Sequence, residues 1–173
     1  MAKRINSIIK VVIAAVVIGC WLFQPVAASA SLAKADKVLV IKSKRLLILL
    51  RNGEILKAYK VALGKHPDGH KTNAGDRKTP EGSYVLDSRK TESKFHKAIH
   101  ISYPNEKDIL EAQKLGVSAG GAIMIHGLPD NLASLGKDHR NWDWTDGCIA
   151  VTNSEIEEIW RLVPDGTPIQ IKP

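Results

Sequence analysis

The feature that most restricts the fold of this chain is a series of short, branched apolar runs separated by turn residues. Three such runs cover residues 38–41, 46–50 and 55–63. Between the second and third runs lies Asn52-Gly53, and an Asn-Gly pair in this position is the strongest short-range signal for a β-hairpin. We therefore predict that residues 38–63 form a β-meander.

Two later segments have helical periodicity. Residues 105–115 are predicted to form a helix with Ile109, Ala112 and Leu115 on one face, and Gly116 follows its end. A second helix is predicted after an N-cap at Asn153. Its apolar face is expected to contain Ile156, Ile159, Trp160 and Val163.

The remaining apolar runs are short and bounded by turn residues. Strands are predicted over residues 83–86, 98–103, 122–125, 149–151 and 169–171. A loop is expected over 65–77, and 128–139 is expected to be a loop with one helical turn. The chain shows no internal repeat or linker. The prediction is a mainly β protein with two or three helices (α+β) in a single domain.

The N-terminus predicts export. Lys3 and Arg4 precede an apolar run over 8–23, and Ala28-Ser29-Ala30 ends the segment with small residues, which is the pattern of a secretory signal peptide. The uninterrupted part, 11–23, is shorter than the about 20 residues that span a bilayer. We predict a signal peptide over 1–30 and a mature chain over 31–173 in the periplasm or cell envelope. The alternatives are a retained membrane anchor and a lipid anchor at Cys20.

Charge gives weaker information about partners. The formal net charge is +7, but Lys3, Arg4 and Lys10 belong to the predicted signal peptide. The sequence has no Arg-rich arm, zinc-finger spacing or basic stripe with aromatic residues, so nucleic acid binding is not predicted. A mildly basic surface is compatible with an anionic polymer such as a cell wall. At 173 residues the chain has the length of one domain, and we expect a monomer.

If the signal peptide is removed, Cys148 is the one cysteine left, and a single unpaired thiol in an exported protein is a candidate nucleophile. The alternative is a buried cysteine that acts as a small apolar residue. Gly147 allows a sharp turn and close approach of a substrate to backbone N–H groups. His126, at the end of a predicted buried strand, could act as the base. Its Nδ1–H could donate to the carbonyl of Gly127, which would leave Nε2 facing the sulfur.

These residues resemble a known family. His126-Gly127, followed after a spacer by Thr145-Asp146-Gly147-Cys148-Ile149, is similar to the motif of the L,D-transpeptidase (YkuD-type) catalytic domain. The opening meander and the segment 79–84 are also similar to that domain. The resemblance implies a YkuD-like β-sandwich or barrel over 31–173. Family members commonly have His in place of Asp146 and Arg in place of Ala150. The Asp146 carboxylate is expected to raise the pKa of the Cys148 thiol.

The resemblance implies an enzyme that acts on peptidoglycan stem peptides. Cys148 would attack the carbonyl of the third residue and expel the terminal D-alanine, with His126 as base and the Gly147 and Cys148 amides holding the oxyanion. An amine from a second stem peptide would then form a cross-link. No cofactor or metal is implied. The alternatives are an L,D-carboxypeptidase or an amidase that releases wall-linked protein, and a non-catalytic wall-binding module.

Other polar and aromatic residues allow more than one interpretation. The pairs His66/His70 and His96/His100 have a spacing that binds zinc on helices, but neither pair lies in a predicted helix, so surface or substrate-loop roles are favoured. Trp142 and Trp144 could shape a substrate groove or serve packing alone. Asp143 is a candidate to orient His126.

Overall fold

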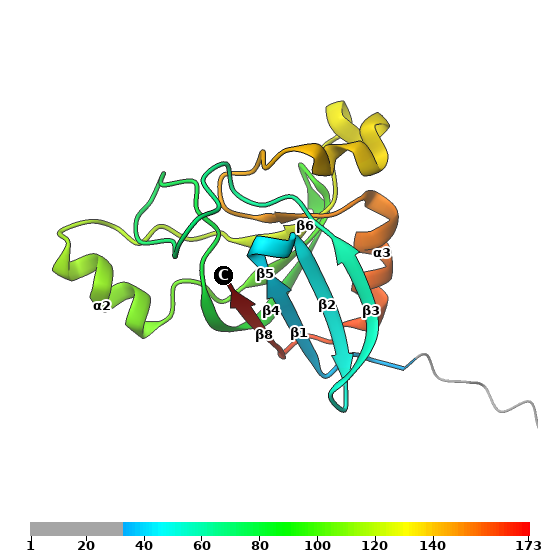
Figure 1. Ribbon diagram of the computed structural model, residues 1–173, viewed down its shortest axis with the longest axis horizontal. Coiled ribbons are helices and arrows are strands. Elements are labelled where there is room, and N and C mark those ends of the chain that lie inside the picture. Colours follow the sequence, from blue (N-terminus) through cyan, green and yellow to red (C-terminus); the bar gives the residue numbers. More distant parts are fainter. Residues whose placement is uncertain (1–32) are drawn as a thin grey trace, which may run out of the picture. The chain divides into compact units, whose positions relative to one another are not determined.

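The predicted hairpin around Asn52-Gly53 is part of an eight-stranded mixed sheet in the computed structural model, which describes residues 33–173 (Figure 1). Asn52 and Gly53 have φ values of 51° and 82°, and two consecutive positive φ values are typical of the tight turn that suits twisted strands.

The predicted signal peptide and the possible lipid anchor at Cys20 lie outside the described residues. No helix within 33–173 has the length and apolar character needed to cross a membrane.

The sheet has the strand order β3-β2-β1-β8-β4-β5-β6-β7. The pairs β1/β8 and β6/β7 are parallel and the other pairs are antiparallel. The strands are β1 (Lys37–Ile41), β2 (Leu46–Arg51), β3 (Glu54–Lys60), β4 (Gly82–Ser93), β5 (His96–Ile101), β6 (Met124–His126), β7 (Ile149–Ala150) and β8 (Thr167–Lys172). The α-helices are α2 (Glu106–Lys114) and α3 (Asn153–Leu162), and the 3₁₀ segments are η1 (Lys42–Lys44) and η2 (Asp130–Asn141). The prediction of a mainly β protein with few helices is confirmed.

The core is formed by one face of the sheet and the apolar face of α3. In β1 burial alternates because side chains alternate along a strand, whereas Leu47, Ile48 and Leu49 of β2 are all buried. On α3, Ile156, Ile159 and Leu162 are buried, and the helix lies alongside the sheet in Figure 1. The N-cap of α3 is Thr152 rather than the predicted Asn153. Thr152 and Glu155 form a capping box that satisfies two backbone N–H groups at the helix start.

Two strands, β4 and β3, differ most from their predicted bounds. β4 continues to Ser93, well beyond the predicted end at Leu86, because it pairs with β5 in a long hairpin from Leu86↔Ile101 to Ser93↔His96. The added residues are mostly polar and exposed, so they carry no apolar alternation. β3 ends at Lys60, and the predicted continuation to residue 63 forms an isolated bridge at Ala62 instead.

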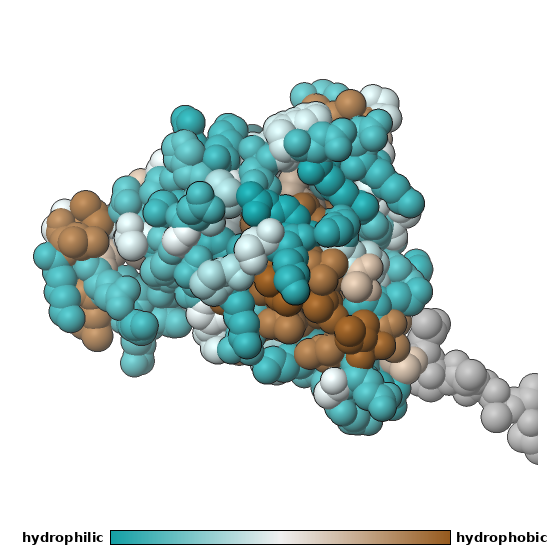
Figure 2. Space-filling view, in the orientation of Figure 1, coloured by the Kyte–Doolittle hydropathy of each residue, from teal (hydrophilic) through white to brown (hydrophobic). Residues whose placement is uncertain are grey.

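The predicted helix over 105–115 is present as α2, but its apolar residues do not form one buried face. Ile109 and Leu115 are 41% and 63% exposed, whereas Asp108 and Ala112 are buried. Asp108 belongs to a capping box with Asn105 at the start of the helix. This buried carboxylate therefore turns the helix away from the orientation that apolar periodicity predicts. In Figure 2 apolar side chains gather accordingly over the outer side of α2. The 3₁₀ segment η2 is longer than the predicted single turn.

Candidate active site

Adjacent strands bring His126 and Cys148 to the same face of the sheet. β6 and β7 pair in parallel with Ile125 opposite Ile149 and His126 opposite Ala150, which places Cys148 beside Met124, two residues before His126. Both residues therefore lie on the face opposite to Ile125 and Ile149. With strands about 4.8 Å apart and a rise of about 3.3 Å per residue, the two Cα atoms are about 8 Å apart. The side chains of histidine and cysteine can span this separation.

His126 is held in one tautomer. The side chain is 1% exposed, and its Nδ1–H donates to the Gly127 carbonyl over 2.7 Å, because a carbonyl can only accept. The Nε2 lone pair is therefore the basic site, as predicted. Burial lowers the pKa of His126 to about 4; the Gly127 carbonyl opposes this shift and His139 adds to it. The ring is neutral near pH 7.

Two aromatic rings pack against His126. Phe95, in the turn between β4 and β5, stacks on it with centroids 4.2 Å apart, and Trp144 meets it edge-on at 5.8 Å. Trp144 thus packs against a residue of the candidate site, whereas Trp142 is exposed at 47%. The role of Phe95 was not predicted, because a single aromatic residue in a polar hairpin turn has no periodic signal.

Gly127 is required by close packing rather than by its φ angle. A Cβ at this position would lie 2.6 Å from Asn153 Oδ1 and 3.0 Å from Ile156 Cγ2. Asn153 Oδ1 also accepts the Leu128 N–H over 2.7 Å. The carbonyl that binds His126 is thus fixed by the packing of this segment against the start of α3.

Thr145 locks the turn that presents Cys148. Its buried hydroxyl donates to the Cys148 carbonyl over 2.7 Å and accepts the Gly147 N–H over 3.1 Å. Gly147 has a φ of +127°, and a Cβ there would lie 2.6 Å from Lys78 O. The predicted sharp turn is present. However, the Gly147 N–H already has a partner in Thr145, so of the two amides predicted to hold an oxyanion the Cys148 N–H is the better candidate.

The thiol of Cys148 is partly buried and protonated near neutral pH. Burial raises its pKa; a hydrogen bond from the Met124 backbone lowers it, Asp146 raises it further and Lys71 lowers it. The predicted effect of Asp146 thus has the right sign, although burial is the larger cause. Sγ lies 3.7 Å from the Ala122 carbonyl. Because the pKa of Cys148 is raised and that of His126 is lowered, the two residues are a neutral thiol and a neutral base rather than a preformed thiolate–imidazolium pair.

A hollow of about 380 Å³ lies beside Asp146, two residues before Cys148. Its walls carry two ionic groups with exposed side chains, Arg77 and Asp146, whose Nε and Oδ1 atoms are 3.9 Å apart. Asp146 Oδ1 also lies 3.3 Å from Lys65 Nζ. Gly121 lines the hollow and directly precedes Ala122, whose carbonyl contacts Sγ.

The prediction that Asp143 orients His126 is wrong. Asp143 Oδ2 accepts two hydrogen bonds from Arg45, at 3.1 and 2.7 Å, and Oδ1 accepts the Leu63 N–H at 2.9 Å. These bonds fix the segment that follows β3 against the loop before Cys148. Because each donor comes from the N-terminal meander, no sequence pattern near Asp143 reveals them.

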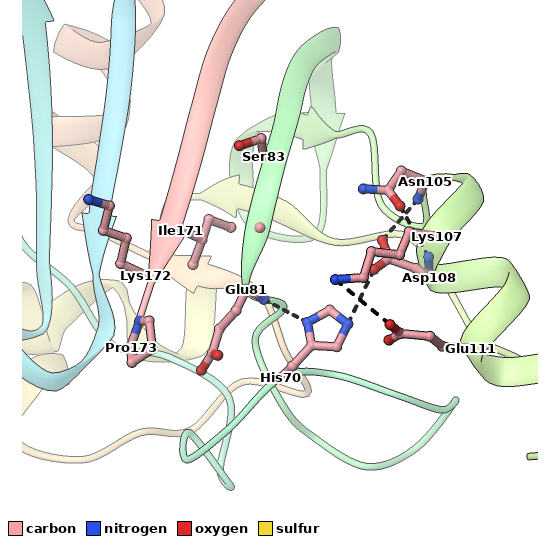
Figure 3. Close-up of a pocket in the computed structure, with 11 residues that line it drawn as sticks. His70, Glu81, Ser83, Asn105, Lys107, Asp108, Glu111, Ile171, Lys172 and Pro173 are labelled. Atoms are coloured by element: carbon pink, nitrogen blue, oxygen red, sulfur yellow. Dashed lines mark hydrogen bonds and ion pairs between the residues drawn. The ribbon is translucent and has the colours of Figure 1, made fainter.

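The four histidines considered as zinc ligands, in the pairs His66/His70 and His96/His100, each have a different partner. His70 lies in a hollow of about 560 Å³, where its Nδ1 accepts the Glu81 N–H at 3.0 Å and its Nε2 lies 3.2 Å from Asp108 Oδ1 (Figure 3). His70 therefore joins the 65–81 loop to the start of α2. His66 contacts the Asp76 carbonyl, His96 contacts Glu157 and His100 contacts Asp87. Within residues 33–173 no three His, Cys, Asp or Glu side chains are placed to hold a metal ion.

Comparisons with known proteins place these features in one family. Residues 35–171 match the model of the YkuD family, the L,D-transpeptidase catalytic domain. YafK of Escherichia coli (strain K12) is 32% identical over 130 residues, which cover 72% of this chain and 45% of that protein.

Two solved structures are similar to this chain in sequence and fold. The helical cell shape determining protein Pgp2 from Campylobacter jejuni is 26% identical with a TM-score of 0.61, over 82% of this chain and 49% of that one. Bd1075 from Bdellovibrio bacteriovorus is 27% identical with a TM-score of 0.54, over 80% and 48%. The chain thus spans about half the length of these relatives.

Proposed function

The chain belongs to the YkuD family of L,D-transpeptidase catalytic domains, and we propose that it is itself a cysteine-dependent L,D-transpeptidase acting on peptidoglycan stem peptides. The observation that carries this proposal is the relation between its two reactive groups. Cys148 stands on a turn locked by Thr145, on the same sheet face as a neutral His126 whose Nδ1–H is bonded to a carbonyl. A thiol beside a fixed imidazole is the arrangement of nucleophile and base that acyl transfer requires.

The first half-reaction forms an acyl-enzyme. As the Cys148 sulfur attacks the carbonyl of the third stem-peptide residue, His126 Nε2 accepts the thiol proton. His126 then returns this proton to the amine of the terminal D-alanine, whose bond to the carbonyl breaks. Because the thiol is protonated and the imidazole neutral before substrate binds, His126 acts as a general base. Such catalysis typically contributes about 10²–10⁴-fold.

Negative charge that develops on the carbonyl oxygen needs a donor. We assign this role to the Cys148 N–H, because the Gly147 N–H already donates to Thr145. Thr145 supports the donor indirectly, since it holds the Cys148 carbonyl and thereby the plane of the turn. A fixed backbone donor is effective in such a site because it requires no reorganisation during the reaction.

The second half-reaction decides between transfer and hydrolysis. An amine from a second stem peptide would form a cross-link, whereas water would release a shortened stem peptide, as in an L,D-carboxypeptidase. We propose cross-link formation as the main activity with hydrolysis beside it. Asp146, whose side chain is 78% exposed beside the thiol, could attract an incoming ammonium group or orient a water molecule.

The test is to incubate the protein with purified disaccharide-tetrapeptide at several acceptor concentrations and to identify products by mass spectrometry. Transfer predicts dimers that increase with acceptor, with one D-alanine released per cross-link. Tripeptide monomers alone, at every acceptor concentration, would establish the hydrolase. No product at all, from folded protein whose thiol does not react with probes, would favour a non-catalytic wall-binding module.

The role of His126 has a separate test. His126→Gln should slow alkylation of Cys148 by iodoacetamide near neutral pH, because the base is absent. Labelling is read from the tryptic peptide 141–161, so that Cys20 does not contribute. His66→Gln is the matched control, since the His66 side chain is exposed and its Nδ1 contacts the Asp76 carbonyl rather than the candidate site. Equal labelling rates in His126→Gln and the unmodified protein would exclude His126 as the base.

We also propose that residues 1–30 are a signal peptide and that the protein acts in the cell envelope. The sequence pattern ending at Ala28-Ser29-Ala30 supports this. The intact mass of protein recovered from the envelope should correspond to a chain that begins at Ser31. A lipid-modified mass that begins at Cys20 would replace this proposal with an anchored lipoprotein.

A further inference from the structure

A second buried histidine lies near the proposed active site and takes no part in the mechanism above. His139, in η2, is fully buried. Its Nδ1 accepts the Trp144 Nε1–H over 3.4 Å, so the ring proton must be on Nε2. Within residues 33–173, Nε2 has no hydrogen-bond partner. A phenylalanine would fill similar space without burying an unpaired donor, so simple packing does not account for this histidine.

His139 is connected to His126 through one indole ring. The rings of His139 and Trp144 are almost perpendicular, with an interplanar angle of 83° and centroids 6.3 Å apart. Trp144 in turn meets His126 edge-on at 5.8 Å, and Phe95 stacks on His126 at 4.2 Å. Trp144 also directly precedes Thr145, whose hydroxyl locks the Cys148 turn. The orientation of this indole therefore affects both proposed reactive groups.

We propose that His139 is a positioning residue, whose Nδ1 holds the indole of Trp144 against His126 so that His126 Nε2 faces the thiol of Cys148. This inference rests on the proposed function, because it assigns His139 a role in aligning the proposed base. It requires the neutral form of His139, since a protonated Nδ1 cannot accept the indole N–H.

The surroundings of His139 favour this neutral form. Burial lowers its pKa to about 4, and the Arg140 guanidinium lowers it as well, whereas Glu155 on α3 raises it. Arg140 and Glu155 form an ion pair with each other. Protonated His126 and His139 would also repel, since each lies beside Trp144. At neutral pH the acceptor is thus available, and it should be lost only near pH 4.

The test compares two substitutions of His139 in the protein recovered from cells. His139→Asn keeps an acceptor near the position of Nδ1, whereas His139→Phe keeps the ring volume without an acceptor. Tyr59→Phe is the control, because it removes a partly buried hydrogen bond, to Glu158, that involves neither Trp144 nor His126. The readouts are the Trp144 indole ¹H–¹⁵N signal, assigned with Trp144→Phe, and the pH profile of Cys148 alkylation by iodoacetamide.

A positioning role predicts that His139→Phe shifts the indole signal upfield and slows alkylation at pH 7 by about tenfold or more, toward the rate of His126→Gln. His139→Asn should recover most of both, and Tyr59→Phe should change neither. An unchanged indole signal and alkylation profile in His139→Phe would overturn the proposal. If His139→Phe does not fold, the test is a pH titration of the unmodified protein. Its Trp144 indole signal should shift as pH falls through about 4. A constant signal would refute the hydrogen bond.

The two proposals fail in different ways. If His126→Gln leaves alkylation unchanged, His126 is not the base and the proposed mechanism is wrong. The indole signal still reports whether His139 holds Trp144. If instead His126→Gln is slow and His139→Phe is as fast as the unmodified protein, the mechanism stands and the positioning role of His139 is refuted.

Discussion

Acid should weaken this fold at a pH where carboxylates are still ionised. His126 and His139 are buried, and burial lowers both pKa values from about 6.5 to about 4. Between these values the unfolded chain binds protons that the folded protein does not bind. Stability therefore falls as pH decreases from about 6.5 to about 4. Above pH 6.5 both histidines are neutral in either state, and their contribution is constant.

The magnitude follows from the two pKa values. Complete titration of one histidine would cost about 3 kcal/mol, and at pH 5 the loss relative to pH 8 is about 2 kcal/mol for each. The two together give about 4 kcal/mol, a large part of the about 5–15 kcal/mol typical of a domain. Carboxylates with lowered pKa values, such as Glu155 and Asp76, lose their contribution at lower pH. The range from pH 8 to 5 thus isolates the histidines.

The assay is urea unfolding at pH 8, 7, 6 and 5, followed by tryptophan fluorescence and extrapolated linearly to water. His126→Gln and His139→Asn should each lose about 2 kcal/mol less than the unmodified protein between pH 8 and 5. His66→Gln, at an exposed position, should follow the unmodified protein. If the stability of His126→Gln and His139→Asn depends on pH as strongly as that of the unmodified protein, the buried neutral histidines are not the cause of the loss of stability in acid.

Two further predictions concern backbone positions that hold the site. Gly127→Ala should destabilise the protein by about 1–3 kcal/mol, because its Cβ would lie 2.6 Å from Asn153 Oδ1; unchanged urea unfolding would contradict this contact. Thr145→Val should cost on the order of 2 kcal/mol and slow alkylation of Cys148, since it leaves the Gly147 N–H and the Cys148 carbonyl without a partner. Thr145→Ser should keep both the stability and the alkylation rate near those of the unmodified protein. A serine variant as impaired as Thr145→Val would refute the role of the Thr145 hydroxyl.

Local signals in the sequence predicted the elements that depend on local chemistry. Asn52-Gly53 predicts the β2–β3 hairpin because few other pairs accept two consecutive positive φ values. The tautomer of His126 was also predictable, since the acceptor is the carbonyl of the next residue. The resemblance to a known family supplied what these local signals did not, namely the YkuD-type domain and the proposal that His126 acts with Cys148.

Most differences from the prediction come from contacts distant in sequence, and one comes from local turn geometry. Asp143 was a candidate to orient His126, but Arg45 and Leu63 bind its carboxylate from the N-terminal meander. α2 turns Asp108 inward because the carboxylate accepts the Tyr84 hydroxyl and caps the helix, and apolar periodicity cannot register such bonds. The engagement of the Gly147 N–H by Thr145 depends on a turn geometry that the motif does not specify.

The central claim is that Cys148 forms an acyl-enzyme with a stem peptide. The most direct measurement is the intact mass of the protein after brief reaction with disaccharide-tetrapeptide without added acceptor and quenching in acid. We predict a mass increase equal to the donor minus D-alanine, located at Cys148 in tryptic peptide 141–161, and no such increase in folded Cys148→Ala. Turnover by Cys148→Ala, or an adduct on another residue, would contradict the account.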